Sequence, residues 1–239
     1  NEPVDAGNGL CKRILSSDVG RLNWLFVSKV FYGKVSLMVW AIEVNDVTKQ
    51  FAGETILENV QLKVAQGKSV GIVGGNGSGK SLLFKLICGF EKPTSGQVKI
   101  RQQVLGEKLD FPENVGVFIN EPGYIELFSG FKNLQFLAAI NNKISAKEIK
   151  EAMELVGLNP NNKTKVKDYS LGMKQKLGLA CTLLSAPKLI ILDEPTVGVD
   201  PLSRRELWDI LQQLAHDDNL SILVSTAYMD EASLCHKVY

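Results

Sequence analysis

Eight residues, Gly74-Gly75-Asn76-Gly77-Ser78-Gly79-Lys80-Ser81, match the pattern G-x-x-x-x-G-K-[ST]. Glycines at these positions let successive backbone N–H groups turn toward phosphate oxygens, and a following helix presents its positive N-terminus to the same anion. Lys80 is expected to reach the β- and γ-phosphates, and the Ser81 hydroxyl to ligate Mg²⁺. A plain glycine-rich turn is the alternative. Because an apolar run precedes the motif and a helical pattern follows it, we predict a nucleotide-phosphate site extending to Leu82.

A pair of carboxylates, Asp193 and Glu194, ends the hydrophobic run "KLIILDE". At the carboxyl end of a parallel strand, these side chains enter the same crevice as the phosphate loop. Asp193 is suited to hold Mg²⁺, and Glu194 to orient and deprotonate a water molecule for attack on the γ-phosphate. Two adjacent carboxylates are a weak signal alone, since most such pairs lie on a solvated surface, but their position after a phosphate loop makes the signal strong.

The elements that must position these groups alternate between strands and helices. Strands are predicted at "VWAIEVND", "ILENVQLKV", Ser69–Val73, "PTSGQVKI", 115–119, 188–194 and "LSILVST", the last of the chain; helices are predicted at 80–90, with Gly89 ending the helix, and at 201–215. The first two strands read as an antiparallel entry sheet. The later apolar runs read as buried parallel strands. The predicted fold is therefore an α/β, P-loop core with a mostly parallel sheet and an antiparallel entry subdomain.

A helical subdomain is expected as an insertion at about 121–178. Its helices are predicted at 131–140 and 145–156, where Ser145 and Glu148 form a capping box and Gly157 ends the second helix. Residues 1–37 carry no readable motif, so the domain prediction is an extension at 1–37 followed by one domain at 38–239. Further strands are expected to follow Tyr239 in a complete domain.

Composition excludes some classes of protein. The formal net charge is +1, which gives no electrostatic reason to expect nucleic acid as a partner. The four cysteines are scattered, without a C-x-x-C pair, so we expect neither a zinc site nor a disulfide framework. The same scatter favours a reducing compartment. The apolar stretch 22–44 is interrupted by Lys29 and Lys34, so we expect no membrane span there.

The motifs occur in the order found in the nucleotide-binding domains of ABC ATPases, and residues 38–239 resemble that family. "GGNGSGKS" is similar to Walker A and "LIILDEP" to Walker B, while "VGVD", ending in Asp200, is similar to the D-loop. Phe51 stands where the family has an aromatic residue that stacks on adenine. The resemblance implies ATP and Mg²⁺ as cofactors.

The segment Tyr169-Ser170-Leu171-Gly172-Met173 resembles the family's signature motif. The resemblance implies that two domains pack head to tail, so that Ser170 and the backbone of Gly172 bind the γ-phosphate held by a partner domain. An N-cap role for Ser170 is compatible with this. Leu171 and Met173 depart from the common LSGGQ form, and the Y-S-x-G-M-K-Q version is similar to ATPases of small-molecule exporters.

Two positions depart from the family. Asn120, followed by Glu121, takes the place of the Q-loop glutamine, and Ala227 takes the place of the switch histidine that contacts the γ-phosphate. The only histidines, His216 and His236, lie elsewhere and read as surface residues. Residues 180–235 most resemble the first half of tandem ABC ATPases, in which one altered site is common.

The resemblance implies an ATP-hydrolysing motor of an ABC exporter, cytoplasmic and peripheral on the inner face of the cell membrane. Its expected partners are a second ATP-binding domain, either as a homodimer or in tandem, and membrane-spanning permease subunits. Hydrolysis is expected to be slow because of Ala227. Two alternatives stay open: a soluble ABC ATPase that drives no transport, for example one acting on ribosomes, and a nucleotide-binding half with little catalysis.

Overall fold

The computed structural model describes residues 39–106, 110–119, 123–141, 144–217 and 219–239. The extension expected at 1–37 and the Q-loop residues Asn120 and Glu121 lie outside these ranges.

An antiparallel sheet opens the described part of the chain, with the strand order β2-β1-β4-β5. Strands β1 (Trp40–Phe51) and β2 (Glu54–Ala65) form a hairpin whose two turn residues, Ala52 and Gly53, both have positive φ angles. Two such residues form the tight turn that matches the twist of paired strands. Strand β1 runs five residues beyond its predicted end at 46, and pairs on its other side with β4 (Ser95–Ile100). The short β5 (Gln103–Val104) was not predicted.

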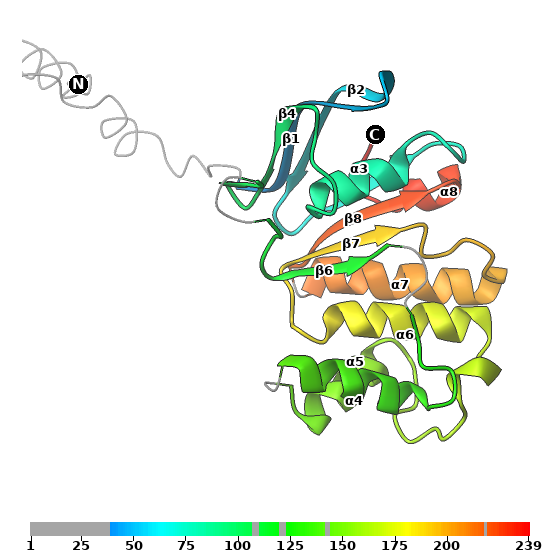
Figure 1. Ribbon diagram of the computed structural model, residues 1–239. Coiled ribbons are helices and arrows are strands. Elements are labelled where there is room, and N and C mark those ends of the chain that lie inside the picture. The colour runs from blue at the N-terminus through cyan, green and yellow to red at the C-terminus, as the bar shows by residue number, and fades with distance from the viewer. Residues whose placement is uncertain (1–38, 107–109, 120–122, 142–143, 218) are drawn as a thin grey trace, which may run out of the picture. The chain divides into compact units, whose positions relative to one another are not determined.

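A second, parallel sheet has the order β6-β7-β8-β3-β9 among the described strands (Figure 1). Its members are β6 (Val115–Phe118), β7 (Leu189–Asp193), β8 (Ser221–Thr226), β3 (Ser69–Val73) and β9 (Lys237–Val238). Every pairing between them is parallel, which confirms the predicted sheet. The prediction that "LSILVST" is the last strand was wrong, because β9 follows it. Two residues are too few to show a strand pattern.

The parallel sheet is buried on both faces. In β7, Ile190 and Leu192 belong to one hydrophobic cluster, and Leu189 and Ile191 to another. Alternate residues of a strand point to opposite faces, so the continuous apolar run predicted this double burial. Helices α6 (Leu171–Leu183) and α7 (Pro201–Asp217) contribute to the first cluster, and α3 (Lys80–Ile87) to the second. Figure 1 shows α3 between the two sheets, and α7 and α6 stacked below the parallel sheet.

Between β6 and α6 the chain forms helices α4 (Gly130–Asn141) and α5 (Ala146–Leu155) and then the short 3-10 helix η1 (Val166–Asp168). A further short helix, α8 (Met229–Ala232), follows β8. The predicted capping box is confirmed. The Ser145 N–H donates to Glu148 Oε2 at 2.6 Å, and the Glu148 N–H donates to Ser145 Oγ at 3.3 Å. Among the helices that the structure describes, none is long and apolar enough to cross a membrane.

Cys88, Cys181 and Cys235 are free thiols. Burial raises the pKa of Cys88 and Cys181 to about 12, and that of Cys235 to about 11. Neutral thiols of this kind are core side chains rather than nucleophiles or metal ligands.

Candidate nucleotide site

The phosphate loop, residues 74–81, joins strand β3 to helix α3. Gly79 has a φ of 91°, and a Cβ at this position would come within 2.8 Å of Leu57 Cδ2 on β2. Only glycine fits this combination of backbone conformation and contact. A Cβ at Gly75 or Gly77 would meet nothing within 4 Å. The loop is therefore held against β2 on one side and is open on the other, where a ligand can approach its backbone.

The Lys80 side chain connects this loop to the end of β7. Its Nζ donates to the carbonyl oxygens of Gly74 at 2.6 Å and Gly75 at 3.0 Å, and lies 3.0 Å from Glu194 Oε1. Lys80 is 7% exposed, so its charge is held by these three oxygens with little help from water. The carboxyl ends of β3 and β7, which lie on either side of β8, thus contribute to one site, as expected at the carboxyl ends of parallel strands.

A serine that the sequence analysis did not single out for the site holds the two carboxylate residues in place. Ser225, fully buried at the end of β8, donates its hydroxyl to Asp193 Oδ1 at 2.6 Å and accepts the Glu194 N–H at 2.9 Å. Glu194 has a φ of 49°, a left-handed conformation that is strained in a non-glycine residue. Ser225 therefore helps to fix an unfavourable backbone at the proposed base. The pairing of β7 with β8, which aligns Asp193 with Ser225, is the signal that could have found it.

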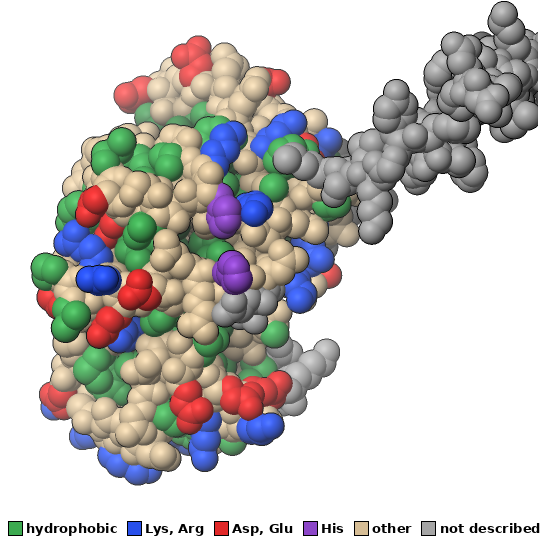
Figure 2. All heavy atoms as spheres, turned by 180° about the vertical axis from the view of Figure 1, so that it is seen from behind, with side chains coloured by type: hydrophobic (Ala, Val, Ile, Leu, Met, Phe, Trp, Pro, Cys, Tyr) green, Lys and Arg blue, Asp and Glu red, His purple; other side chains and the backbone are tan. Residues whose placement is uncertain are grey.

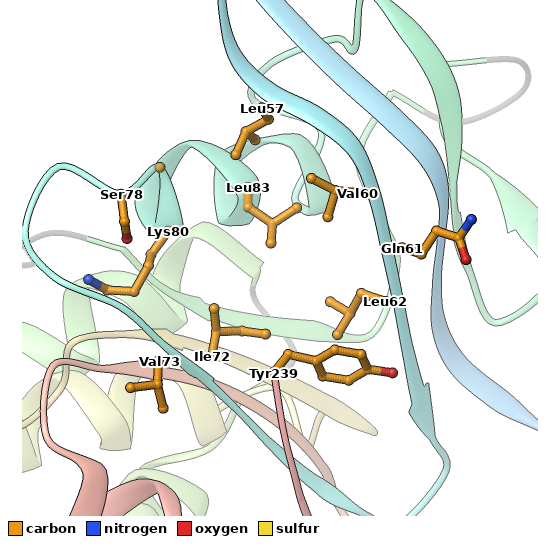
Figure 3. Close-up of a pocket in the computed structure, with 11 residues that line it drawn as sticks. Leu57, Val60, Gln61, Leu62, Ile72, Val73, Ser78, Lys80, Leu83 and Tyr239 are labelled. Atoms are coloured by element: carbon orange, nitrogen blue, oxygen red, sulfur yellow. The ribbon is translucent and has the colours of Figure 1, made fainter.

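Behind the loop lies a cavity of about 250 Å³ (Figure 3). Apolar side chains of β2, β3 and α3 make up most of its walls, with Lys80 and Ser78 toward one side and Tyr239 facing it. Apolar walls do not suit phosphate groups. The cavity is therefore less suited to phosphate than the backbone N–H groups of the loop.

The side chains expected to hold Mg²⁺ and adenine are compatible with these ligands. Ser81 is exposed and Asp193 is 9% exposed, and both offer the oxygen donors that Mg²⁺ prefers. Leu82 is half-buried on α3. Phe51 is 45% exposed at the tip of the β1–β2 hairpin, with Lys49 Nζ 4.6 Å from its ring centre. An exposed ring on the hairpin that also contacts Gly79 can stack on a base.

The signature segment, residues 169–173, begins helix α6. Ser170 is exposed at the N-cap, and its hydroxyl accepts the Met173 N–H at 3.2 Å. A Cβ on Gly172 would lie 2.7 Å from the side chain of Ser203 on α7, and one on Gly198 would lie 3.1 Å from Leu171. The start of α6 is therefore packed closely against the D-loop, residues 197–200, and the start of α7.

Asp200 ends the D-loop and accepts the Ser203 N–H at 3.0 Å, as an N-cap residue does. This hydrogen bond and one from the Ser203 hydroxyl hold the pKa of Asp200 below its usual value. Pro201 follows it as the first residue of α7, a position that proline favours.

The switch segment, residues 225–232, begins with the last two residues of β8 and continues beyond it. Ala227 is exposed, while its neighbour Thr226 is 1% exposed. His216 and His236 are both exposed, and histidine side chains lie on the face shown in Figure 2. His236 Nδ1 accepts the backbone N–H of Ser69, at the other end of β3 from the phosphate loop. Position 227 therefore presents only a methyl group.

Comparison with known proteins identifies the class. Residues 57–197 match the model of the ABC transporter family. The chain belongs to this family and is an ATP-binding cassette, an ATPase domain. This confirms the resemblance drawn from the motifs, and the α/β P-loop fold agrees with the solved cassettes.

Among the curated relatives, the chain is 35% identical over 196 residues to the bacitracin transport ATP-binding protein BcrA of Enterococcus faecalis, covering 82% of this chain and 64% of that protein. It is 36% identical over 203 residues to the uncharacterized ABC transporter ATP-binding protein YhcH of Bacillus subtilis, covering 84% of this chain and 67% of that protein. The chain thus spans about two thirds of the length of these relatives.

A solved structure, described as a dimeric post-hydrolysis state of the ATP-binding cassette MJ0796 bound to ADP and Pi, matches with a TM-score of 0.72. The match covers 82% of this chain and 92% of that chain at 23% identity. At this identity the match shows a shared fold.

Proposed function

We propose that this chain is the ATP-hydrolysing motor of an ABC exporter, working with Mg²⁺. The observation that carries the proposal is the contact of 3.0 Å between Lys80 and Glu194. It brings the residue proposed to bind the β- and γ-phosphates next to the residue proposed to activate water. ATP bound in the loop would draw Lys80 onto its phosphates and leave Glu194 beside the γ-phosphate, where a general base must lie.

The residues divide into two groups by role. Residues 74–82 hold the phosphates, Ser81 and Asp193 hold Mg²⁺, and Phe51 stacks on adenine. Ser170, Leu171, Gly172 and Met173 close over the nucleotide of a second ATP-binding domain, with Asp200 beside them. Because the exposed Ser170 already caps α6, its hydroxyl and the N-terminus of that helix face outward together, which suits a phosphate on a partner.

Transport is supported by the relatives, since one is named for bacitracin transport. The motor would lie on the cytoplasmic face of the membrane, bound to permease subunits. Several exposed apolar side chains follow the proposed Q-loop in the sequence, and they are candidate contacts with permease subunits. They are Ile125, Leu127, Phe128, Phe136, Leu137 and Ile140.

Calorimetry with ATP and Mg²⁺ on the full chain tests the nucleotide assignment. Lys80→Ala removes the main cation at the phosphates, and charged hydrogen bonds of this kind contribute roughly 1.5–3 kcal/mol. We expect ATP affinity to fall on the order of tenfold or more. Lys85→Ala, five residues further along α3, is the matched control and should bind ATP normally. Equal affinity in wild type and Lys80→Ala would overturn the assignment.

A further inference from the structure

A buried carboxylate lies behind the switch segment, outside the residues assigned so far. Glu231 is on the short helix α8 and is 2% exposed. Its Oε2 accepts hydrogen bonds from the hydroxyls of Thr226 at 2.5 Å and Thr196 at 2.8 Å. Both threonines are 1% exposed, so all three side chains are shielded from water. Burying a carboxylate is costly, which makes its two hydrogen bonds strong constraints on the groups that donate them.

The two threonines belong to the two segments that border the proposed hydrolytic site. Thr226 ends β8 and directly precedes Ala227, and its hydroxyl also accepts the Tyr228 N–H at 3.0 Å. Thr196 lies two residues after Glu194, in the connection from β7 to α7. One carboxylate therefore connects the switch segment to the segment that follows the proposed base.

Thr196 also stands inside the turn that shapes the backbone of Glu194. The Val197 N–H donates to the Glu194 carbonyl at 3.2 Å, and the Val199 N–H donates to the Thr196 carbonyl at 3.2 Å. Glu194 has a left-handed backbone, which persists only when its surroundings over-determine it. The hydrogen bond from Thr196 to Glu231 is one such surrounding constraint, in addition to the bond from Glu194 to Ser225.

A third element reaches the same carboxylate. Arg204, on α7, has its Nε 3.6 Å from Glu231 Oε1, an ion-pair distance beyond that of a hydrogen bond. Its guanidinium lies 4.3 Å from the ring centre of Tyr228. Arg204 thus packs on the switch segment from α7, whose first turn also contacts Gly172 of the signature segment through Ser203.

We infer that Glu231 is a positioning residue for ATP hydrolysis: through Thr196 it holds the backbone of Glu194, and through Thr226 it holds the segment that carries Ala227. The inference rests on the proposed function, because it assumes that Glu194 acts on ATP at this site. A segment without a histidine has no imidazole of its own to contact the γ-phosphate. The position of the switch segment then depends on the buried residue that holds it by hydrogen bonds, which is Glu231. We call this residue the anchor.

The test uses hydroxyl removal without a change of shape. Thr196→Val loses the hydrogen bond to Glu231, while Thr196→Ser keeps it. Glu231→Gln removes the negative charge and leaves only one side-chain oxygen to accept a hydrogen bond. The control is Asp230→Asn, an exposed acid on the same helix. We expect Thr196→Val and Glu231→Gln to lower kcat by about tenfold or more, since a misplacement of about 1 Å can cost on the order of 100-fold. ATP affinity and KM should stay unchanged, and Thr196→Ser and Asp230→Asn should behave as wild type.

Amide hydrogen exchange of the nucleotide-free chain gives a readout that does not need hydrolysis. Peptides covering 194–199 and 226–231 should exchange faster in Thr196→Val than in Thr196→Ser, and the rest of the chain should be unchanged. The inference is overturned if kcat is unchanged in the two altered variants, or if ATP affinity falls together with kcat. If the wild type itself does not hydrolyse ATP, the proposed function fails, and exchange alone decides whether the anchor exists. If Glu231→Gln does not fold, the two Thr196 variants carry the test.

Discussion

At residue 227 the chain has an exposed methyl group, next to the buried Thr226. A methyl group cannot donate a hydrogen bond to a γ-phosphate or hold an attacking water in line. Glu194 remains as the proposed general base, and a positioned base typically contributes about 10²–10⁴-fold to a rate. We therefore expect near-normal ATP binding with slow, measurable hydrolysis by this chain alone.

The steady-state ATPase rate of Ala227→His checks this expectation. Because the neighbouring Thr226 and Glu231 fix the segment, an imidazole introduced here should meet the phosphate without rebuilding the loop. A rise of about tenfold, corresponding to roughly 1.4 kcal/mol of barrier, is the expected result. Ala227→Phe adds a ring without a hydrogen-bonding group and should not raise the rate. An unchanged rate in Ala227→His would mean that another group already fills the histidine's role.

Residues in motifs could be foreseen, but their partners could not. The spacing of Gly74–Ser81 and the carboxylates at 193 and 194 predicted a shared crevice, and the structure has Lys80 3.0 Å from Glu194. The contact of Thr196 with Glu231 joins residues 35 positions apart in sequence. Hydrogen bonds of this kind depend on how α8 packs beside β8, and no local pattern in a single sequence specifies that packing.

At the scale of the secondary-structure elements, helix α5 begins with a capping box that includes an ionisable residue, Glu148. The pKa of Glu148 lies below its usual value, first because its carboxylate accepts the Ser145 backbone N–H and then because of the Ser145 hydroxyl. A lowered folded-state pKa means that the carboxylate stabilises the fold above its unfolded pKa of about 4.3. This contribution is lost as the pH falls through the lower folded-state pKa.

Urea denaturation of Glu148→Ala at several pH values tests this. The variant should have a lower free energy of unfolding than wild type at about pH 7, and the difference should shrink as the pH falls below about 4. Glu154→Ala, at the other end of the same helix, is the control. There a negative charge opposes the helix dipole, so its removal should not destabilise the fold. A Glu148→Ala deficit that is constant with pH would contradict the capping role of the charge.

The elements themselves were predictable where their sequence signals were long or chemically distinct. Buried runs such as Leu189–Asp193 and the capping box at Ser145 have such signals. The extension of β1 to Phe51 and the two-residue β9 have no such sequence signal. In the first case the turn at Ala52-Gly53 sets where the hairpin ends, and in the second the pairing with β3 makes the strand. Both features depend on how strands pair, and the propensities of single residues do not predict that pairing.

At the scale of the whole molecule, the proposed function assigns the phosphate loop and the signature segment to two different nucleotides. The phosphate loop and Glu194 meet at the edge of the parallel sheet, whereas the signature segment packs on the D-loop and α7 with Ser170 exposed. In the proposed function, a single chain therefore supplies one phosphate-binding half and one closing half. If two such domains pack head to tail, as we propose, both halves are completed, and bound ATP then favours the assembled state.

A variant that binds ATP without hydrolysing it should trap this assembly. Glu194→Gln keeps the size of the side chain but removes the base, so the γ-phosphate stays in place. We expect size-exclusion chromatography of Glu194→Gln with ATP and Mg²⁺ to show a species about twice the mass of the chain. Without ATP it should elute as a single chain. Adding Ser170→Arg places a bulky cation on the closing surface and should abolish the larger species, while calorimetry shows ATP binding intact.

Superimposable elution with and without ATP would contradict closure between two copies. The same comparison with a tandem partner domain then tests whether closure requires a second, different cassette.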